Sequence, residues 1–242
     1  MESKKQTPAT AERPILFNSD MVRAILQGRK TQTRRIAKHQ FWQHHELINA
    51  NNNGQLTGNK DTSVNCPYGR PGDLLWVRET FEATTHELIG KNQYQTLRRI
   101  KFKADGVEKY EKWMPSIFMP KDICRIWLQV KSVRIERLGD ISEEDAIAEG
   151  VRSQFIDLFQ EMRWRDYMTY QPEHIFGWRA PTSSFFSLWE SINGAESLAA
   201  NPWIWVVEFD VLSKTIKPLT WKGKQIRIDE EAAKAESKSV EA

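Results

Sequence analysis

A short stretch, GRKTQTRRI at positions 28–36, concentrates positive charge and hydroxyl groups where a predicted helix ends. Its cationic and hydroxyl-bearing residues are Arg29, Lys30, Thr31, Thr33, Arg34 and Arg35. The net charge of the chain is only +3, so an anionic partner would have to be bound by a local patch of this kind. Cations at a helix C-terminus also stabilise the helix dipole while they stay in solvent. The stretch therefore leaves two interpretations open, an anion-binding site and a solvated helix end.

Motifs for metals, triphosphates and dinucleotides are absent from the sequence. His39, His44 and His45 lie near one another, but no HExxH or paired-cysteine motif accompanies them. There is no P-loop and no GxGxxG. The only cysteines, Cys66 and Cys124, are expected to be reduced and structural. We therefore predict no metal and no cofactor.

The cationic stretch must be positioned by the elements before it. Residues 15–17 (ILF) predict a short strand, and residues 18–30 predict a helix that Ser19 or Asp20 caps. Val22, Ile25 and Leu26 share one face of this helix. Gly28 suits a left-handed helix exit.

Two further helices are predicted. Residues 140–151 (DISEEDAIAEGV) carry Ser142 and Asp145 at the spacing of a capping box, with Gly150 at the exit. Residues 182–194 place apolar side chains at helical spacing, namely Phe185, Leu188, Trp189 and Ile192.

Alternating apolar residues predict strands at 74–81, from 123 onward, and at 203–211. The alternation changes parity near Lys131 and Ser132, which predicts a β-bulge or corner. Few of the strands are separated by regular helices, so a doubly wound parallel sheet is not expected. The fold class that fits is α+β, a small, mostly antiparallel β-barrel decorated with helices.

The chain is predicted to form one domain, residues 14–212, between a disordered leader, 1–13, and a charged, flexible tail, 213–242. Large insertions fall near 39–65, expected as an exposed loop, and near 82–113 and 152–184. A strand pair is possible within residues 94–105. The N-terminus has no apolar signal segment and no run of residues could span a bilayer, so the expectation is a cytoplasmic protein with no membrane partner.

Four segments together resemble a known family, the ASCH domain of the PUA-like superfamily, in particular the longer versions that phages and prophages encode. They are RAILQGRKTQTRRI, PGDLLWVRE, LGDISEEDAIAEGV and NPWIWVVEFDVL. The resemblance covers roughly half of the chain. It implies a PUA-like β-barrel with a cleft that faces nucleic acid or a modified nucleoside.

One branch of this family is similar to metal-independent amidohydrolases that remove the acetyl group from N4-acetylcytidine. That branch uses a lysine and a threonine in a G-[RK]-K-x-x-T stretch, and a glutamate on a helix that begins [LI]-[ST]-E. The matching residues are Lys30, Thr33 and Glu149. The resemblance therefore implies that Thr33 attacks an amide after Lys30, kept neutral, takes its proton, while Glu149 protonates the departing amine.

The same cleft could bind a ligand without catalysis. In this alternative, phosphates contact Arg29, Arg34, Arg35 and Arg78, and a base stacks on Trp76. Glu79 is a further candidate pocket residue, although pairing with Arg78 or Arg35 is its more ordinary role. A ribonuclease and a purely structural role in phage biology also remain open.

Overall fold

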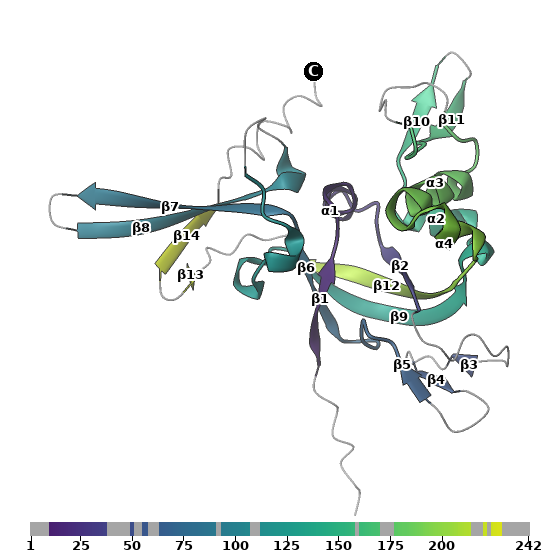
Figure 1. The fold of residues 1–242 in the computed structure, drawn as a ribbon, viewed down its shortest axis with the longest axis horizontal. Helices are drawn as coiled ribbons and strands as arrows, with labels where there is room; N and C mark the ends of the chain where they lie inside the picture. The colour runs from purple at the N-terminus through teal and green to yellow at the C-terminus, as the bar shows by residue number, and fades with distance from the viewer. Residues whose placement is uncertain are drawn as a thin grey trace, which may run out of the picture.

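A computed structural model shows the arrangement of the chain (Figure 1). The structure describes residues 10–37, 49–50, 55–57, 63–90, 93–106, 112–157, 160–169, 177–213, 220–221 and 224–228.

A five-stranded sheet forms the centre of the fold, with the strand order β1-β6-β9-β12-β2. Its strands are β1 (Glu12–Leu16), β6 (Leu74–Arg78), β9 (Trp127–Arg137), β12 (Trp203–Ser213) and β2 (Gln32–Ile36). β1 and β6 run parallel, and the other neighbours are antiparallel. The expected α+β class and mostly antiparallel sheet are thereby confirmed.

The expected closed barrel is wrong for the described residues, because β1 and β2 are the two edges of the sheet and do not pair. Helix α1 (Ser19–Leu26) connects these edge strands and lies over the opening between them (Figure 1). Its Val22 and Ile25 are buried in the same core as the sheet. The Arg35 side chain spans the gap, donating from Nη2 to the Leu16 carbonyl at 2.6 Å. In a closed barrel, hydrogen bonds would join β1 to β2. In this structure α1 and the Arg35 side chain lie between these two strands instead.

Strand β12 is buried on both faces. Trp205, Val207 and Phe209 face the core that contains α1, whereas Ile204 and Val206 face the helices on the other side. The predicted alternation over 203–211 is confirmed.

The predicted irregularity in β9 is also confirmed. Ser132 pairs with Glu208, but the next pair along the ladder is Val130 with Phe209. Lys131 is therefore the additional residue of a bulge.

The caps of the helices agree with the sequence in part. At α1 the side chain of Asn18, rather than of Ser19 or Asp20, accepts from the Met21 amide at 2.9 Å. The predicted caps were wrong because the helix begins one residue earlier, which leaves Asp20 free to bind Arg23. Gly28 has the predicted left-handed conformation, with φ of +76°.

Helices α2 (Glu143–Ala148), α3 (Pro181–Asn193) and α4 (Ala195–Ala199) gather at one end of the sheet (Figure 1). Ser142 caps α2 as predicted, accepting from the Asp145 amide at 3.1 Å. The predicted helix over 182–194 is confirmed, whereas α4 was not predicted.

The insertions form small sheets of their own. β7 (Phe81–Gly90) and β8 (Gln93–Phe102) make a long hairpin, so residues 94–105 contribute one strand of a pair rather than both. β14 (Lys224–Ile228) pairs with β8 and β13 (Thr220–Trp221), and both strands fall within the segment expected as a tail. Likewise β1 begins at Glu12, inside the predicted leader. Residues 1–9 and 229–242 lie outside the described residues.

The remaining elements are short. They are β3 (Asn49–Ala50), β4 (Gln55–Thr57), β5 (Ser63–Asn65), β10 (Ser153–Ile156), β11 (Glu161–Trp164), η2 (Lys103–Asp105), η3 (Ser116–Phe118), η4 (Lys121–Ile123) and η5 (Leu138–Asp140). The first three lie in the predicted loop 39–65, whose other residues are mostly outside the described ones. Among the helices that the structure describes, none is both long and apolar enough to cross a bilayer.

A buried ion pair holds the start of β9 against the segment that follows β6. Arg125 donates from Nε and Nη2 to the two carboxylate oxygens of Glu79, both at 2.8 Å, and from Nη1 to Asp105 at 2.7 Å. Glu79 is 1% exposed. Its predicted pairing with Arg78 or Arg35 was wrong, since its partner is the guanidinium of Arg125, which lies 46 residues away in the segment before β9. Glu79 therefore joins two segments of the fold.

Replacing Glu79 by alanine should lower the free energy of unfolding by about 3–5 kcal/mol, because it leaves the Arg125 charge buried with a weaker partner. Urea unfolding measures this change. The matched control is Lys131→Ala, which breaks an exposed pair with Asp210 at 3.5 Å and should change stability by less than about 1 kcal/mol. Equal losses of unfolding free energy in the two variants would show that the buried Glu79–Arg125 pair contributes no more to stability than an exposed pair.

Candidate functional site

Two cations of the 28–36 stretch are buried and meet at one carboxylate. Lys30, which is 0% exposed, donates from Nζ to Glu149 Oε2 at 2.6 Å and to the Glu149 carbonyl at 2.9 Å. Arg34 donates from Nη1 to Glu149 Oε1 at 3.2 Å. The family resemblance implied one site for Lys30 and Glu149, and the two side chains are in contact. The interpretation of these cations as a solvated helix end is wrong for Lys30 and Arg34.

The backbone brings the end of α1 against the end of α2. The amides of Arg29 and Lys30 donate to the Ala24 carbonyl, which ends α1. Thr31 then donates its amide to the Ala148 carbonyl at 2.9 Å, and Arg29 Nη1 donates to the Gly150 carbonyl at 2.6 Å. Arg29 therefore holds the chain after α2 and does not line the cavity described below.

Gly150 permits this close approach. Its φ is +88°, and a Cβ built there would lie 2.9 Å from the Cβ atoms of both Ala24 and Lys30. Only glycine fits between the two helix ends without displacing them.

Arg34 extends the ion pair into a network. Its Nη2 donates to Glu136 Oε1 and to Asp145 Oδ2, each at 2.6 Å. Arg134 donates to the same Asp145 oxygen and pairs with Glu208. Three carboxylates thus surround the Arg34 guanidinium, so its main role is to join β2 to α2 and β9, which corrects the prediction of a freely available phosphate ligand.

The environment of Lys30 favours loss of its proton. Burial lowers the pKa of Lys30, and the nearby charges of Arg35 and Arg34 lower it further, while Glu149 opposes the shift. Lys30 Nζ and the Arg35 guanidinium also lie 5.7 and 5.2 Å from the Phe17 ring centroid, which gives both cations a favourable aromatic contact.

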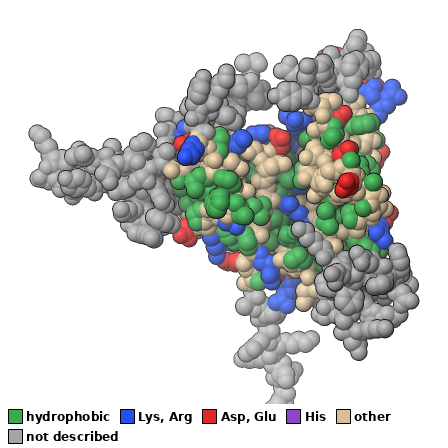
Figure 2. Space-filling model, viewed as in Figure 1, with side chains coloured by type: hydrophobic (Ala, Val, Ile, Leu, Met, Phe, Trp, Pro, Cys, Tyr) green, Lys and Arg blue, Asp and Glu red, His purple; other side chains and the backbone are tan. Residues whose placement is uncertain are grey.

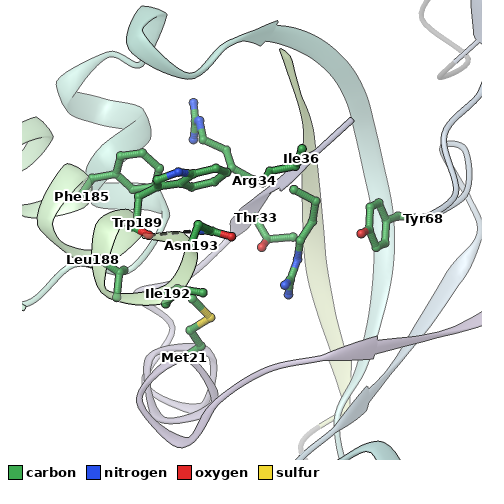
Figure 3. Close-up of a pocket in the computed structure, with 11 residues that line it drawn as sticks. Met21, Thr33, Arg34, Ile36, Tyr68, Phe185, Leu188, Trp189, Ile192 and Asn193 are labelled. Atoms are coloured by element: carbon green, nitrogen blue, oxygen red, sulfur yellow. Dashed lines mark hydrogen bonds between the residues drawn. The ribbon is translucent and has the colours of Figure 1, made fainter. Parts of the chain in front are cut away.

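A cavity of about 240 Å³ lies beside this network, between β2 and α3. We call it the β2–α3 cavity. Its polar lining residues are Thr33, Arg34, Arg35, Tyr68 and Asn193. Its apolar lining residues are Met21, Ile36, Phe185, Leu188, Trp189 and Ile192. Figure 3 shows Thr33 between Tyr68 on one side and Trp189 and Asn193 of α3 on the other.

The wall of this cavity contains hydrogen-bond donors that lack a protein partner. Arg34 Nε and Arg35 Nε are both buried and have no hydrogen-bond partner among the described residues. A buried N–H group without an acceptor is costly. Both atoms are closed off from solvent, so an acceptor in the cavity contacts them only after the side chains shift.

Glu149 borders a second, much smaller space of about 10 Å³. Met21 and Leu188 line both this space and the β2–α3 cavity. Lys30 lines neither of them. The structure therefore brings Lys30, Thr33, Arg34, Arg35 and Glu149 into one region, with two apolar side chains between the carboxylate and the larger cavity.

Trp76 and Arg78 do not belong to this region, which corrects their predicted roles. Leu75 and Val77 of β6 face the core, so Trp76 and Arg78 lie on the opposite face of the strand. Arg78 donates from Nε to the Met119 carbonyl at 3.1 Å and stacks over the Trp76 ring, 5.2 Å from its centroid. Both side chains are engaged in holding the segment around η3.

Several residues of the cavity wall were missed by sequence reasoning. Trp189 and Leu188 were predicted as the core face of their helix, and they do pack in a core cluster, but the same face lines the cavity. Asn193 lies four residues after Trp189 and therefore puts a polar group at the end of that apolar face. This polar group was the one sequence signal for a cavity beside the face. No sequence signal distinguished Tyr68.

Searches of this chain against protein-family models, curated proteins and solved structures found no match.

Gly150→Ala should lower the free energy of unfolding by about 2–5 kcal/mol, since it combines a left-handed backbone with overpacking against Ala24 and Lys30. The matched control is Gly28→Ala, which has a similar φ but nothing within 4 Å of the new Cβ. It should cost only the backbone strain of about 1–2 kcal/mol. Chemical unfolding of both variants measures the difference, and equal losses would mean that the α1–α2 contact is not tight.

The stability that Lys30 contributes should rise with pH. Its pKa in the folded protein lies below the ordinary value of 10.5, so between these two values the unfolded chain binds a proton that the folded protein does not. The unfolding free energy of the wild type minus that of Lys30→Met should therefore increase with pH in this window and level off above it. Urea titrations from pH 7 to about 11 test this. A difference that falls with pH would show that Glu149 raises the pKa of Lys30 instead.

Proposed function

We propose that this chain binds a modified nucleoside, or one base of a nucleic acid, in the β2–α3 cavity and hydrolyses the amide of N4-acylated cytidine there. The fold we propose for it is a PUA-like one of the ASCH type, in an opened form. The observation that carries the proposal is the contact of Lys30 with Glu149 behind a cavity wall that contains Thr33.

The size and lining of the cavity support a ligand no larger than one nucleoside. Its volume of about 240 Å³ lies below the ~300–1,000 Å³ of clefts for drug-sized ligands. Tyr68 and Trp189 offer aromatic surface to a planar base. The Thr33 hydroxyl and the Asn193 amide, which line the cavity, suit carbonyl and ring-nitrogen acceptors of a pyrimidine.

The proposed chemistry uses the Lys30–Glu149 pair as a proton-sharing unit. When the shared proton lies on Glu149, Lys30 is neutral and takes the proton of the Thr33 hydroxyl as this oxygen bonds to the acyl carbon. The positive charge of Arg35, which lines the cavity, stabilises the developing oxyanion. The carbon–N4 bond then breaks, and Glu149 gives its proton to N4, which releases cytidine.

Water completes the cycle. It hydrolyses the ester on Thr33, the acid leaves, and the hydroxyl of Thr33 is restored. Lys30, which now carries the proton taken from Thr33, returns it to Glu149, and the pair regains its starting state. Displacement of the flexible Met21 side chain would join the space beside Glu149 to the cavity.

A non-catalytic reader of modified bases is the second candidate. The observation that favours it is the complete burial of Lys30, which lines neither cavity and is held by Glu149. Binding needs only the cavity wall and not an accessible lysine.

Acetate release from N4-acetylcytidine tests the enzymatic proposal. Lys30→Met and Thr33→Val should each lower kcat by about 10²–10⁴, because general acid–base and nucleophilic steps contribute on this scale. Thr31→Val is the matched control, since Thr31 belongs to the same stretch but is exposed, and it should retain wild-type activity.

Equilibrium binding of the same nucleoside separates the two candidates. If the wild type binds the nucleoside saturably but releases no acetate, the hydrolysis proposal is contradicted and the non-catalytic reader of modified bases is the remaining candidate. Absence of both binding and release would overturn the proposal as a whole.

A further inference from the structure

Another cavity, of about 250 Å³ and separate from the two spaces described above, lies at the beginning of β1 and β6. We call it the β1–β6 cavity. Ala11, Arg13, Asn65, Cys66, Gly69, Arg70 and Asp73 line it, and Figure 2 shows Lys and Arg side chains near the lower end of β1. None of these residues takes part in the ion network around Glu149.

The acidic group of this cavity is already engaged by backbone donors. Asp73 Oδ1 accepts from the Ala11 amide at 3.0 Å, and Oδ2 accepts from the Arg70 amide at 3.2 Å. Arg13 Nε is 4.0 Å from Oδ2, which is the outer limit of an ion pair. No hydrogen bond or ion pair joins the Arg70 guanidinium to the part of the chain that the structure describes. The Arg13 guanidinium therefore lies near a carboxylate whose oxygens hold the turn together, and Arg70 adds a second cationic side chain to the cavity lining.

The turn itself is tightly built. Gly69 has φ of +102°, and a Cβ there would lie 2.8 Å from Asp73 Oδ2. The Gly69 amide donates to the Cys66 carbonyl at 3.1 Å. Burial raises the pKa of the Cys66 thiol to about 12, so this group stays neutral and does not repel an anion.

The two cavities are linked by a short segment of chain. Tyr68 lines the β2–α3 cavity and Arg70 lines the β1–β6 cavity. The Cα atoms of Tyr68 and Arg70 lie at most about 7 Å apart, so the walls of the two cavities adjoin along this segment, and a ligand that occupies both must carry a base and an anionic group. A polynucleotide meets this requirement, because every base is flanked by phosphates.

We propose that the β1–β6 cavity binds a backbone phosphate of a single-stranded polynucleotide whose unpaired base occupies the β2–α3 cavity, with Arg13 and Arg70 as its ligands. This inference rests on the function proposed above and defines its substrate as a residue within a strand rather than a free nucleoside. A single strand presents its base directly, whereas a base inside a duplex must first leave the stack to enter the pocket.

The test compares three probes by fluorescence competition: N4-acetylcytidine, its 5′-monophosphate, and a short single-stranded oligoribonucleotide that contains one N4-acetylcytidine. In the Arg13→Ala/Arg70→Ala double variant, affinity for the oligoribonucleotide should fall about tenfold, the size expected for loss of a charged hydrogen bond. The slope of log affinity against log salt should fall by about 0.7, the value for one phosphate of a single strand. Arg179→Ala is the matched control, since this arginine is 79% exposed and lines neither cavity, and it should change nothing.

Two outcomes would overturn the phosphate site, namely an unchanged salt slope in the double variant and an equal loss in Arg179→Ala. A tenfold loss for the 5′-monophosphate would assign the site to the phosphate of a single nucleotide and would overturn the requirement for a strand. If the nucleoside binds while the double variant behaves as wild type, only this inference fails. If the wild type binds none of the probes, the proposed function fails with it.

Discussion

The contact between Lys30 and Glu149 is the constraint on which the rest of the site depends. Both side chains are withdrawn from water, and a charge in such a place is tolerated only with a partner and further hydrogen bonds. Lys30 finds them in the carboxylate and in the Glu149 carbonyl, and the other carboxylate oxygen goes to Arg34. The end of α1, the strand β2 and the end of α2 therefore meet at one point.

The cations of residues 28–36 are positioned by contacts within the protein and are not an exposed basic patch. Arg34 is held by three carboxylates and Arg35 by the Leu16 carbonyl and the Phe17 ring, so both guanidinium groups have fixed positions beside the cavity. What the cavity wall offers a ligand is the charge of Arg35 together with the Thr33 side chain. Groups held in fixed positions can orient a ligand without first having to reorganise.

Local patterns in the sequence were sufficient to predict the helices, caps and strand irregularity that position the site. The apolar spacing of 18–30, the cap at Ser142, the exits at Gly28 and Gly150 and the parity change near Lys131 each depend on neighbouring residues, and each is found. The proximity of Lys30 and Glu149 came instead from the family resemblance, since no periodicity relates residues 119 positions apart.

The errors concern partners chosen by the tertiary structure. Glu79 binds Arg125, which lies 46 residues away, and not a neighbour in the sequence. The barrel does not close because α1 and Arg35 fill the place of the missing strand contacts. Trp76 and Arg78 were correctly placed on a strand, but which face of that strand looks toward the cavity depends on the curvature of the whole sheet, and this has no local signature.

A double-mutant cycle on Lys30→Met and Glu149→Gln, read by urea unfolding, tests the central contact most directly. If the two side chains are a buried pair, the loss in the double variant should differ from the sum of the single losses by more than about 1 kcal/mol, because each single substitution leaves the other group without its partner. Losses that add to within about 0.5 kcal/mol would show that Lys30 and Glu149 do not interact, and the account of the site would be contradicted.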